Sequence, residues 1–155
     1  MWTKAPACCV IANTHVPASI ATALIEQVQA SGDVVDAIAQ AKQCLERFTS
    51  AFNQHDLAGM DANLHFPHQM WAGADLLVWQ HPGSHPVGFF DQLCSTGWAH
   101  TRYESIQPVL ASAHKVHLLV DYSRRSAQDE TLSRHQNLWV VVQRGGRWGI
   151  VLRSY

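Results

Sequence analysis

The sequence lacks an excess of charge of either sign. Its 155 residues include 12 acidic and 11 basic side chains, and the basic ones are scattered along the chain. Proteins that bind nucleic acid or anionic membranes concentrate positive charge on one face or segment, so we expect neither partner here. No apolar run approaches the roughly 20 residues that a membrane-spanning helix needs. We therefore also expect no membrane-embedded segment.

Cysteine pairs with the spacing of a zinc or redox site are missing too. The four cysteines are Cys8, Cys9, Cys44 and Cys94, with no C-x-x-C among them, and the adjacent pair cannot easily form a bridge. Cys44 and Cys94 fall in helical patterns, where a buried free thiol is expected. This cysteine usage favours a reducing cytoplasm.

Motifs that hold metals or phosphates are absent as well. Three pairs of histidines, 65/68, 81/85 and 114/117, have helical spacing but fall on expected strands or loops, where residues three apart point to opposite faces. The sequence contains no H-E-x-x-H zinc motif, no glycine-rich phosphate loop and no G-x-S-x-G nucleophile elbow. We therefore expect neither a metal nor a cofactor.

The patterns that are present predict one domain of helices followed by strands. Residues 1–17 are expected to be a loosely attached leader, and residues 18–155 a single domain. Helices are predicted at 17–30, from Asp33 to Phe52 with one apolar stripe, and after Asp56, which can cap the third. A hairpin follows at 65–71 and 76–81, with Pro67 indicating an edge or a bulge. A further short helix is predicted from Val87 to Ser95.

The last third of the chain is the strongest pattern. It predicts four antiparallel strands, at about 99–111, 116–125, 132–144 and 147–155. Gly145-Gly146 separates two runs of β-branched and aromatic residues, and glycine adopts positive φ twice without steric cost. We expect Arg144 to pair with Arg147 across this turn. Alternation then places the following residues together on one face: Asn137, Trp139, Val141, Trp148, Ile150 and Leu152. The other face is expected to carry Leu138, Val140, Val142, Val151 and Tyr155.

Both faces of this hairpin are apolar, whereas a half-exposed antiparallel sheet would have one polar face. The helices cover one side only. We therefore predict a homodimer that buries the other.

This order of elements predicts an α+β fold, with N-terminal helices packed on a curved antiparallel sheet in a cone. Several segments resemble the nuclear transport factor 2-like superfamily, in its SnoaL-like and ketosteroid-isomerase-like branch. They are 48–56 (FTSAFNQHD), 65–67 (HFP), 97–98 (GW), 122–124 (YSR) and 146–150 (GRWGI). The resemblance covers about residues 33–155. It implies an α+β roll that usually dimerises through its sheet, in a superfamily that includes isomerases, dehydratases, cyclases and non-enzymes.

Asp121 is the first candidate for catalysis, because it interrupts the apolar run 116–120. A carboxylate desolvated there would have a raised pKa and could act as a general acid or base. It could equally form a buried pair with Arg102 or Arg153. His100 is the candidate for proton transfer, or else structural. Tyr122 could donate to an oxyanion.

The expected ligand-binding residues are mostly aromatic. Trp71, Phe90 and Trp98 either line a cavity at the mouth of the cone or fill the core. Tyr103 could donate to an oxyanion or simply pack, and Arg124 could orient a ligand carboxylate or reach solvent. Asn137 shares a face with Trp139, where it could orient a ligand carbonyl or satisfy the strand edge.

These features lead to two functional hypotheses. The first is a cofactor-free enzyme that carries out proton transfer (isomerisation, dehydration or cyclisation) on a small apolar, oxygenated molecule. The second is a non-catalytic ligand-binding or dimerisation module of the same fold.

Overall fold

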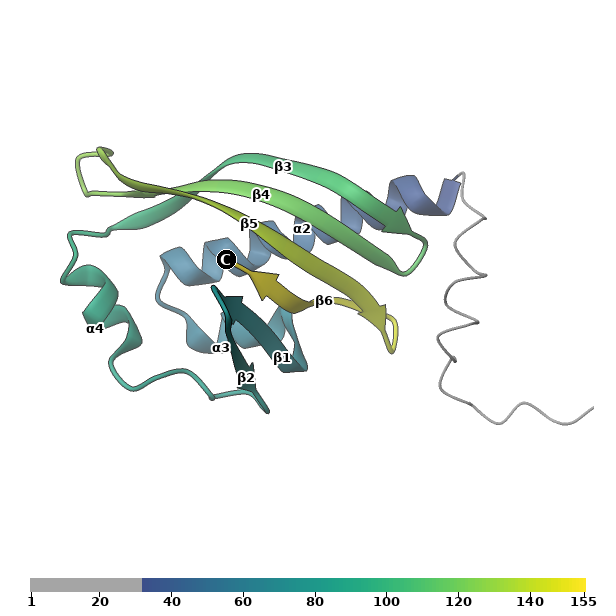
Figure 1. Cartoon of the computed structure of the whole chain (residues 1–155), viewed down its shortest axis with the longest axis horizontal. Helices are drawn as coiled ribbons and strands as arrows, with labels where there is room; N and C mark the ends of the chain where they lie inside the picture. Colours follow the sequence, from purple (N-terminus) through teal and green to yellow (C-terminus); the bar gives the residue numbers. More distant parts are fainter. Residues whose placement is uncertain (1–31) are drawn as a thin grey trace, which may run out of the picture.

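The structure is a computed structural model and describes residues 32–155 (Figure 1). The expected leader and the helix predicted at 17–30 lie outside these residues. The helices are α2 (Gly32–Asn53), α3 (Leu57–Ala62) and α4 (Phe89–Cys94). The strands are β1 (Leu64–Ala72), β2 (Asp75–Trp79), β3 (His100–Ser112), β4 (Lys115–Arg125), β5 (Thr131–Arg144) and β6 (Arg147–Ser154).

Within the described part of the chain the strands form one six-stranded sheet in the order β2-β1-β6-β5-β4-β3. The predicted four-strand antiparallel meander, β3 to β6, is confirmed. The sheet as a whole is mixed, however, because β1 pairs in parallel with β6. Pro67 lies where the β1–β6 register shifts, between Leu64 and Gln69, so it marks an irregularity inside the sheet and not an edge.

Local sequence signals explain where several elements begin and end. The Asp56 side chain accepts a hydrogen bond from the Gly59 backbone N–H and caps α3, as predicted. Arg144 pairs with Arg147 across the expected turn, and the two glycines between them have φ values of 55° and 74°. Side chains rarely adopt such angles, so glycine suits both positions.

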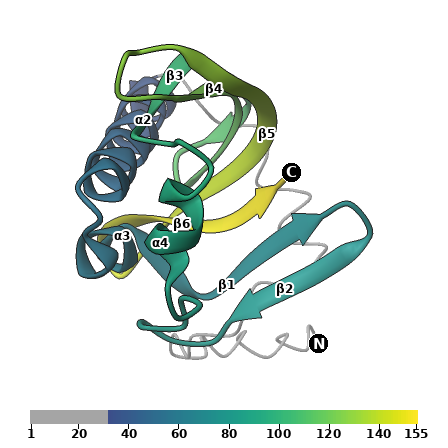
Figure 2. The ribbon, with the colours of Figure 1, turned by 90° about the vertical axis from the view of Figure 1, so that its left-hand side faces the viewer.

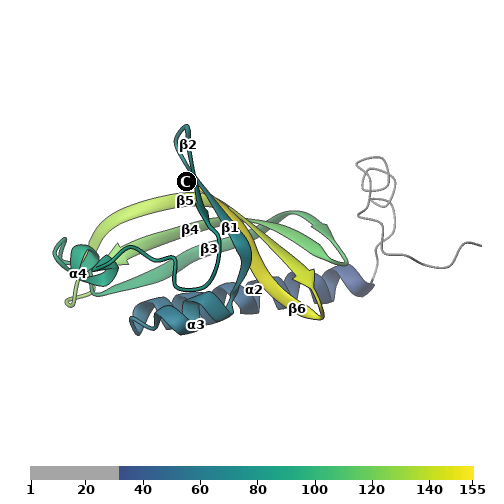
Figure 3. The same ribbon diagram turned by 90° about the horizontal axis from the view of Figure 1, so that it is seen from below.

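Helices α2 and α3 pack on one face of the curved sheet (Figure 3), and α4 lies at one end of it (Figure 2). The predicted α2 stripe does face the sheet, with Leu45 and Phe48 in its centre. Alternate β4 residues Val116, Leu118 and Val120 are fully buried against it. We call this the inner face, and the opposite side the outer face.

A bulge in β6 changes which side chains share the inner face. Val141 pairs with Ile150, but Val140 pairs with Leu152, so Val151 is the extra residue. Arg153 therefore lies opposite Trp139 on the inner face. Leu152, expected on this face, lies on the outer one, and Tyr155, expected on the outer one, reaches the inner side.

Two further observations concern single residues. A Cβ on Gly149 would lie 2.6 Å from the His65 ring, so close packing explains this glycine. Cys44 is buried, and burial raises its pKa to about 11, whereas Cys94, also expected to be buried, is exposed. Among residues 32–155 no helix is long and apolar enough to cross a membrane.

Candidate functional site

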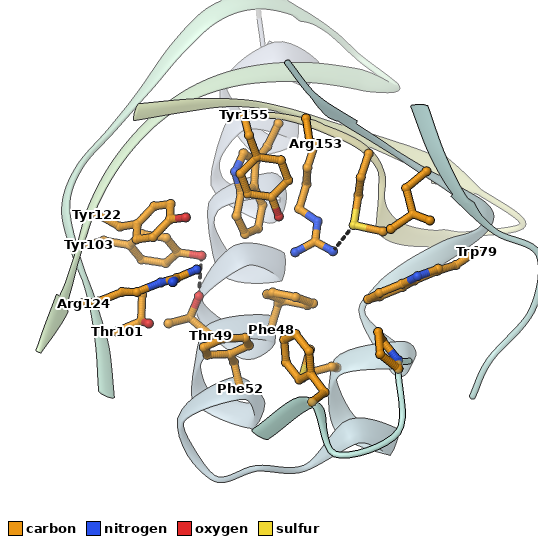
Figure 4. Close-up of a pocket in the computed structure, with 17 residues that line it drawn as sticks. Phe48, Thr49, Phe52, Trp79, Thr101, Tyr103, Tyr122, Arg124, Arg153 and Tyr155 are labelled. Atoms are coloured by element: carbon orange, nitrogen blue, oxygen red, sulfur yellow. Dashed lines mark hydrogen bonds between the residues drawn. The ribbon is translucent and has the colours of Figure 1, made fainter. Parts of the chain in front are cut away.

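A cavity of about 280 Å³ lies between α2 and the inner face of the sheet (Figure 4). Its walls come from α2, α3, β1 to β6 and the segment around α4. Most of the lining is apolar: Phe48, Phe52, Met60, Met70, Ala72, Leu77, Trp79, Pro86, Phe89 and Trp139. The polar lining residues are Thr49, Thr101, Tyr103, Tyr122, Arg124, Arg153 and Tyr155. Among residues 32–155 the cavity lining thus contains two cations and no acidic or imidazole side chain.

Arg153 is the most unusual lining residue, since it is only 6% exposed. Its Nε donates to His68 Nε2 at 3.0 Å, and its Nη2 contacts Met70 Sδ at 2.9 Å. Four aromatic rings surround its guanidinium carbon at 5.2–5.8 Å: Phe48, Trp79, Trp139 and Tyr155. Within residues 32–155 no carboxylate lies within 4 Å of it. Aromatic faces stabilise this cation in place of an acid.

His68 positions Arg153. Its Nδ1 lies 3.1 Å from the Ile150 carbonyl, which can only accept, so Nδ1 carries the proton. Nε2 is then unprotonated and accepts from Arg153. Burial, and secondly the charge of Arg153, lower the pKa of His68 to about 3. The imidazole is therefore neutral and acts as a rigid acceptor.

Arg124 enters the cavity from β4, on a different side from Arg153 (Figure 4). In the described part of the chain it forms no hydrogen bond or ion pair. Trp139 also has an unused donor, because its indole Nε1 is buried without a partner among residues 32–155. The cavity lining therefore carries positive charge without an acidic partner in residues 32–155, and the Trp139 N–H is buried beside it without an acceptor among those residues.

The two tyrosines differ in how much of their hydrogen-bonding capacity is used. Tyr103 donates to the Leu45 carbonyl at 3.1 Å and accepts from Thr49, so its phenolic proton is already engaged in a hydrogen bond within the protein. Tyr122 accepts a long bond of 3.4 Å from Asn137 and has no acceptor for its own proton in the described structure. Burial raises the pKa of both phenols. Tyr122 is thus a neutral phenol with a proton to donate.

A histidine–aspartate pair lies immediately behind the cavity wall. His85 Nε2 is 2.7 Å from Asp61 Oδ1, and Asp61 Oδ2 accepts from the Gly83 N–H at 2.8 Å. The His85 side chain is 2% exposed, and its Nδ1 is buried without a partner among residues 32–155. Its ring contacts Trp79 and Phe89, which both line the cavity.

Asp121 and His100 are not where the sequence predicted them. Val120 and Tyr122 face the core, so Asp121 between them faces outward. It accepts hydrogen bonds from Ser105 and Gln136, which lower its pKa, in that order of effect. The expected raised pKa is therefore wrong, and so is the pairing with Arg102 or Arg153. His100 lies 3.2 Å from Asp129 on the same outer side, away from the cavity.

Of the expected ligand-binding residues, Tyr103, Arg124 and Trp139 line the cavity, as does Tyr122. Four others do not. Trp71 is 39% exposed on β1. Phe90 and Trp98 pack against Phe52 and His55 in an aromatic cluster beside the cavity. Asn137 is buried behind Tyr122.

Sequence reasoning missed Arg153, His68 and the pair of His85 with Asp61 as members of the site. A bulge that no motif announces brings Arg153 inside, and His85 meets Asp61 only because the loop after β2 folds back onto α3. One sequence signal was available for Arg153, because it follows the apolar run Ile150-Val151-Leu152. A charged residue in such a strand is unusual unless it is paired or functional. In residues 32–155 no three histidine, cysteine, aspartate or glutamate side chains gather as a metal site would require.

Comparisons with known proteins connect this geometry to one fold. The sequence matches no family model and no curated protein. An NTF2-like protein of unknown function from Pseudomonas putida is 13% identical with a TM-score of 0.60, over 77% of this chain and 85% of that one. A putative ketosteroid isomerase from Shewanella frigidimarina is 12% identical with a TM-score of 0.53, over 74% and 93%.

A third similar structure is hexachlorocyclohexane dehydrochlorinase LinA-type3 from Novosphingobium barchaimii. It is 12% identical with a TM-score of 0.59, over 79% of this chain and 86% of that one. At such low identity the likeness concerns the backbone and not the activity. The chain has the α+β fold of the NTF2-like proteins, as its sequence segments predicted.

Proposed function

We propose that the protein is a cofactor-independent enzyme that moves a proton on a small, largely apolar molecule, as an isomerase or a lyase. The observation that carries this proposal is the buried pair of His85 and Asp61 against the cavity wall. Two proteins of the same fold are named as a putative ketosteroid isomerase and a dehydrochlorinase, which supports the reaction class.

The pair supplies a base by fixing one tautomer. Because Asp61 accepts from Nε2, the lone pair of His85 is on Nδ1. His85 lies behind Trp79 and Phe89 and not in the cavity lining, so a substrate reaches Nδ1 only when these side chains shift. Removal of a carbon-bound proton by Nδ1 would then create an imidazolium, which the adjacent carboxylate stabilises. The Gly83 N–H holds the second oxygen of Asp61. Asp61 therefore orients His85 and is a positioning residue.

The electrons left by the departing proton must be accommodated on the substrate. They move onto a conjugated carbonyl oxygen in an isomerisation, or expel a leaving group in an elimination. In the described structure the Tyr122 phenolic proton has no acceptor, and the Nη1 N–H groups of Arg153 have none either. Both side chains line the apolar cavity. Donors preorganised in a dry cavity stabilise such charge more strongly than water does.

A second candidate function is non-catalytic binding of a small molecule. It is favoured by the cavity lining, to which residues 32–155 contribute no carboxylate and no imidazole. In that case the His85–Asp61 pair would only connect the loop after β2 to α3.

Solvent-deuterium exchange separates these two functions. Cyclohexanone, 2-tetralone and phenylpyruvate are incubated with the protein in D2O, and deuterium at carbon next to the carbonyl is followed by NMR. We expect exchange above the buffer rate with at least one probe, and His85→Gln to reduce it by about 10²- to 10⁴-fold. His81→Gln, at an exposed histidine four residues away, is the matched control. Exchange that His85→Gln leaves unchanged would overturn the proposal, and the absence of any exchange would favour binding alone.

We also propose that the protein is a cytoplasmic homodimer assembled through the outer face of the sheet. Half-buried apolar side chains form a continuous surface there over three adjacent strands: Leu119, Leu138, Val140, Val142 and Leu152. Large apolar patches on soluble proteins often mark an interaction site.

A further inference from the structure

We infer that the cavity binds a small apolar carboxylate, whose carboxyl group pairs with Arg153. This deepens the proposed function, on which it rests for the use of the same cavity, by naming the class of substrate. The starting observation is a buried cation with no acid near it within residues 32–155. Buried arginines are normally paired, because an isolated charge in an apolar interior is costly.

The guanidinium of Arg153 has room for one more partner. Of its five N–H groups, Nε–H is occupied by His68, and one N–H of Nη2 points to a thioether, which is a weak acceptor. Both N–H groups of Nη1 have no acceptor in the described structure. A carboxylate bridging Nη1 and Nη2 would complete the fork and neutralise the charge.

Two further lining residues carry donor groups and favour an acceptor-rich ligand. The indole N–H of Trp139 is buried without a partner in the described residues, and the Trp139 ring lies 5.5 Å from the Arg153 guanidinium carbon. Arg124 adds a second cation without a partner in the described part of the chain. A ligand with a carboxylate and a second oxygen would satisfy these groups, whereas a cationic ligand would be repelled.

The remaining walls set the size and character of the ligand. At about 30 Å³ per molecule of liquid water, the cavity of about 280 Å³ has the volume of roughly nine water molecules. Phenylalanine, tryptophan and methionine side chains surround that space. These dimensions fit a monocyclic aromatic or alicyclic acid, with its ring against Phe48 and Phe52. A dianionic phosphate group would need both arginines around it, whereas Arg124 enters the cavity on a different side from Arg153.

His68 explains how the site keeps Arg153 ready for such a ligand. Its neutral imidazole holds Nε in place without supplying a counter-charge, whereas a carboxylate at that position would compete with the ligand. The four surrounding rings restrict the side chain further. The geometry is thus preorganised, which lowers the ordering cost of binding.

Isothermal titration of the full chain with benzoate, benzamide and phenylphosphonate tests this inference. We expect benzoate to bind on the order of ten- to a hundredfold more tightly than benzamide, and phenylphosphonate more weakly than benzoate. Arg153→Met should remove this preference while benzamide binding persists. Trp139→Phe, which keeps a ring and loses the donor, should weaken benzoate several-fold. Arg144→Gln, in the exposed turn, is the matched control.

Equal affinity for benzoate and benzamide, tighter phenylphosphonate binding, or no binding of any probe would each overturn the inference. Arg153→Met removes a buried charge, so folding is verified by circular dichroism. If that variant fails to fold, the inference is still tested by the affinities of the wild type and of Trp139→Phe for benzoate relative to benzamide. His85→Gln should bind benzoate like the wild type, so loss of exchange in that variant reports on the proposed function alone.

Discussion

The inner and outer faces of the sheet differ in whether their arginines have acidic partners among the described residues. On the outer face, Arg125 lies 3.2 Å from Glu104 and 3.8 Å from Asp129, and Glu104 also accepts from Ser123. On the inner face, Arg153 and Arg124 have no acidic partner in residues 32–155. Paired charges hold a fold together, whereas unpaired ones in a cavity are available to a ligand. This difference is the reason for proposing that a ligand binds on the inner face.

The comparison is tested most strongly by a pair of adjacent leucines. Leu118 is fully buried on the inner face, and Leu119 is half-buried on the outer face. Leu118→Ala should lower the free energy of unfolding by about 2–5 kcal/mol, because it leaves a cavity in the core. Leu119→Ala should lower the free energy of unfolding by less than about 1.5 kcal/mol, because the Leu119 side chain is already partly exposed to solvent and its removal leaves no closed cavity.

Urea denaturation at low protein concentration measures both leucine variants under one condition. Similar losses for the two would show that the outer face is as fully covered as the inner one. The urea denaturation is then repeated at higher protein concentration. If the outer face forms a dimer, the loss of stability caused by Leu119→Ala should depend on protein concentration, whereas the loss caused by Leu118→Ala should not.

The next largest effect concerns pH and His68. Its pKa is about 3 in the folded protein and about 6.5 in an unfolded chain. The folded state therefore excludes a proton that the unfolded state takes up as pH falls below 6.5. Stability from this group is complete above pH 6.5 and declines by up to about 1.4 kcal/mol per pH unit toward pH 3.

His68→Gln removes this titration and keeps an acceptor for Arg153. Urea unfolding between pH 7 and pH 4.5 should therefore fall less steeply for the variant than for the wild type. The exposed His114→Gln is the control for general effects of histidine loss. If His68→Gln and the wild type follow parallel curves, His68 is not a buried neutral group.

The proposed dimer gives a prediction for the outer face alone. Val140→Glu places a charge among the half-buried side chains of β5 and should raise the dimer dissociation constant by at least about a hundredfold. Val87→Glu, at a 97% exposed position away from this face, is the control. Light scattering at micromolar concentration provides the measurement. A wild type that is already monomeric there would contradict the dimer.

The fold was largely predictable, and the site only in part, for a physical reason. The antiparallel β3–β6 meander, the Gly145-Gly146 turn and the Asp56 cap follow from local signals, and each is confirmed. Strand alternation holds in β6 only as far as Ile150. The parallel β1–β6 pairing and the bulge at Val151 depend on distant contacts. One extra residue reverses which side chains enter the cavity, so Arg153 could not be assigned. Likewise, Asp121 is visibly polar within an apolar strand, but periodicity alone does not say which face is the inner one.

The smallest expected effect belongs to Asp121, the residue that sequence alone placed first. Its carboxylate faces outward and accepts hydrogen bonds from Ser105 and Gln136. The side-chain oxygen of an asparagine can still accept one of these two bonds. Asp121→Asn should therefore leave benzoate affinity and deuterium exchange within about twofold of the wild type, since in the described structure its side chain forms no hydrogen bond or ion pair with a cavity residue. Titration calorimetry and NMR measure both quantities on one preparation, with Arg153→Met as the contrasting variant. A loss of benzoate binding in Asp121→Asn comparable to that in Arg153→Met would show that the outer face takes part in ligand recognition. The proposal that ligands bind only on the inner face would then be wrong.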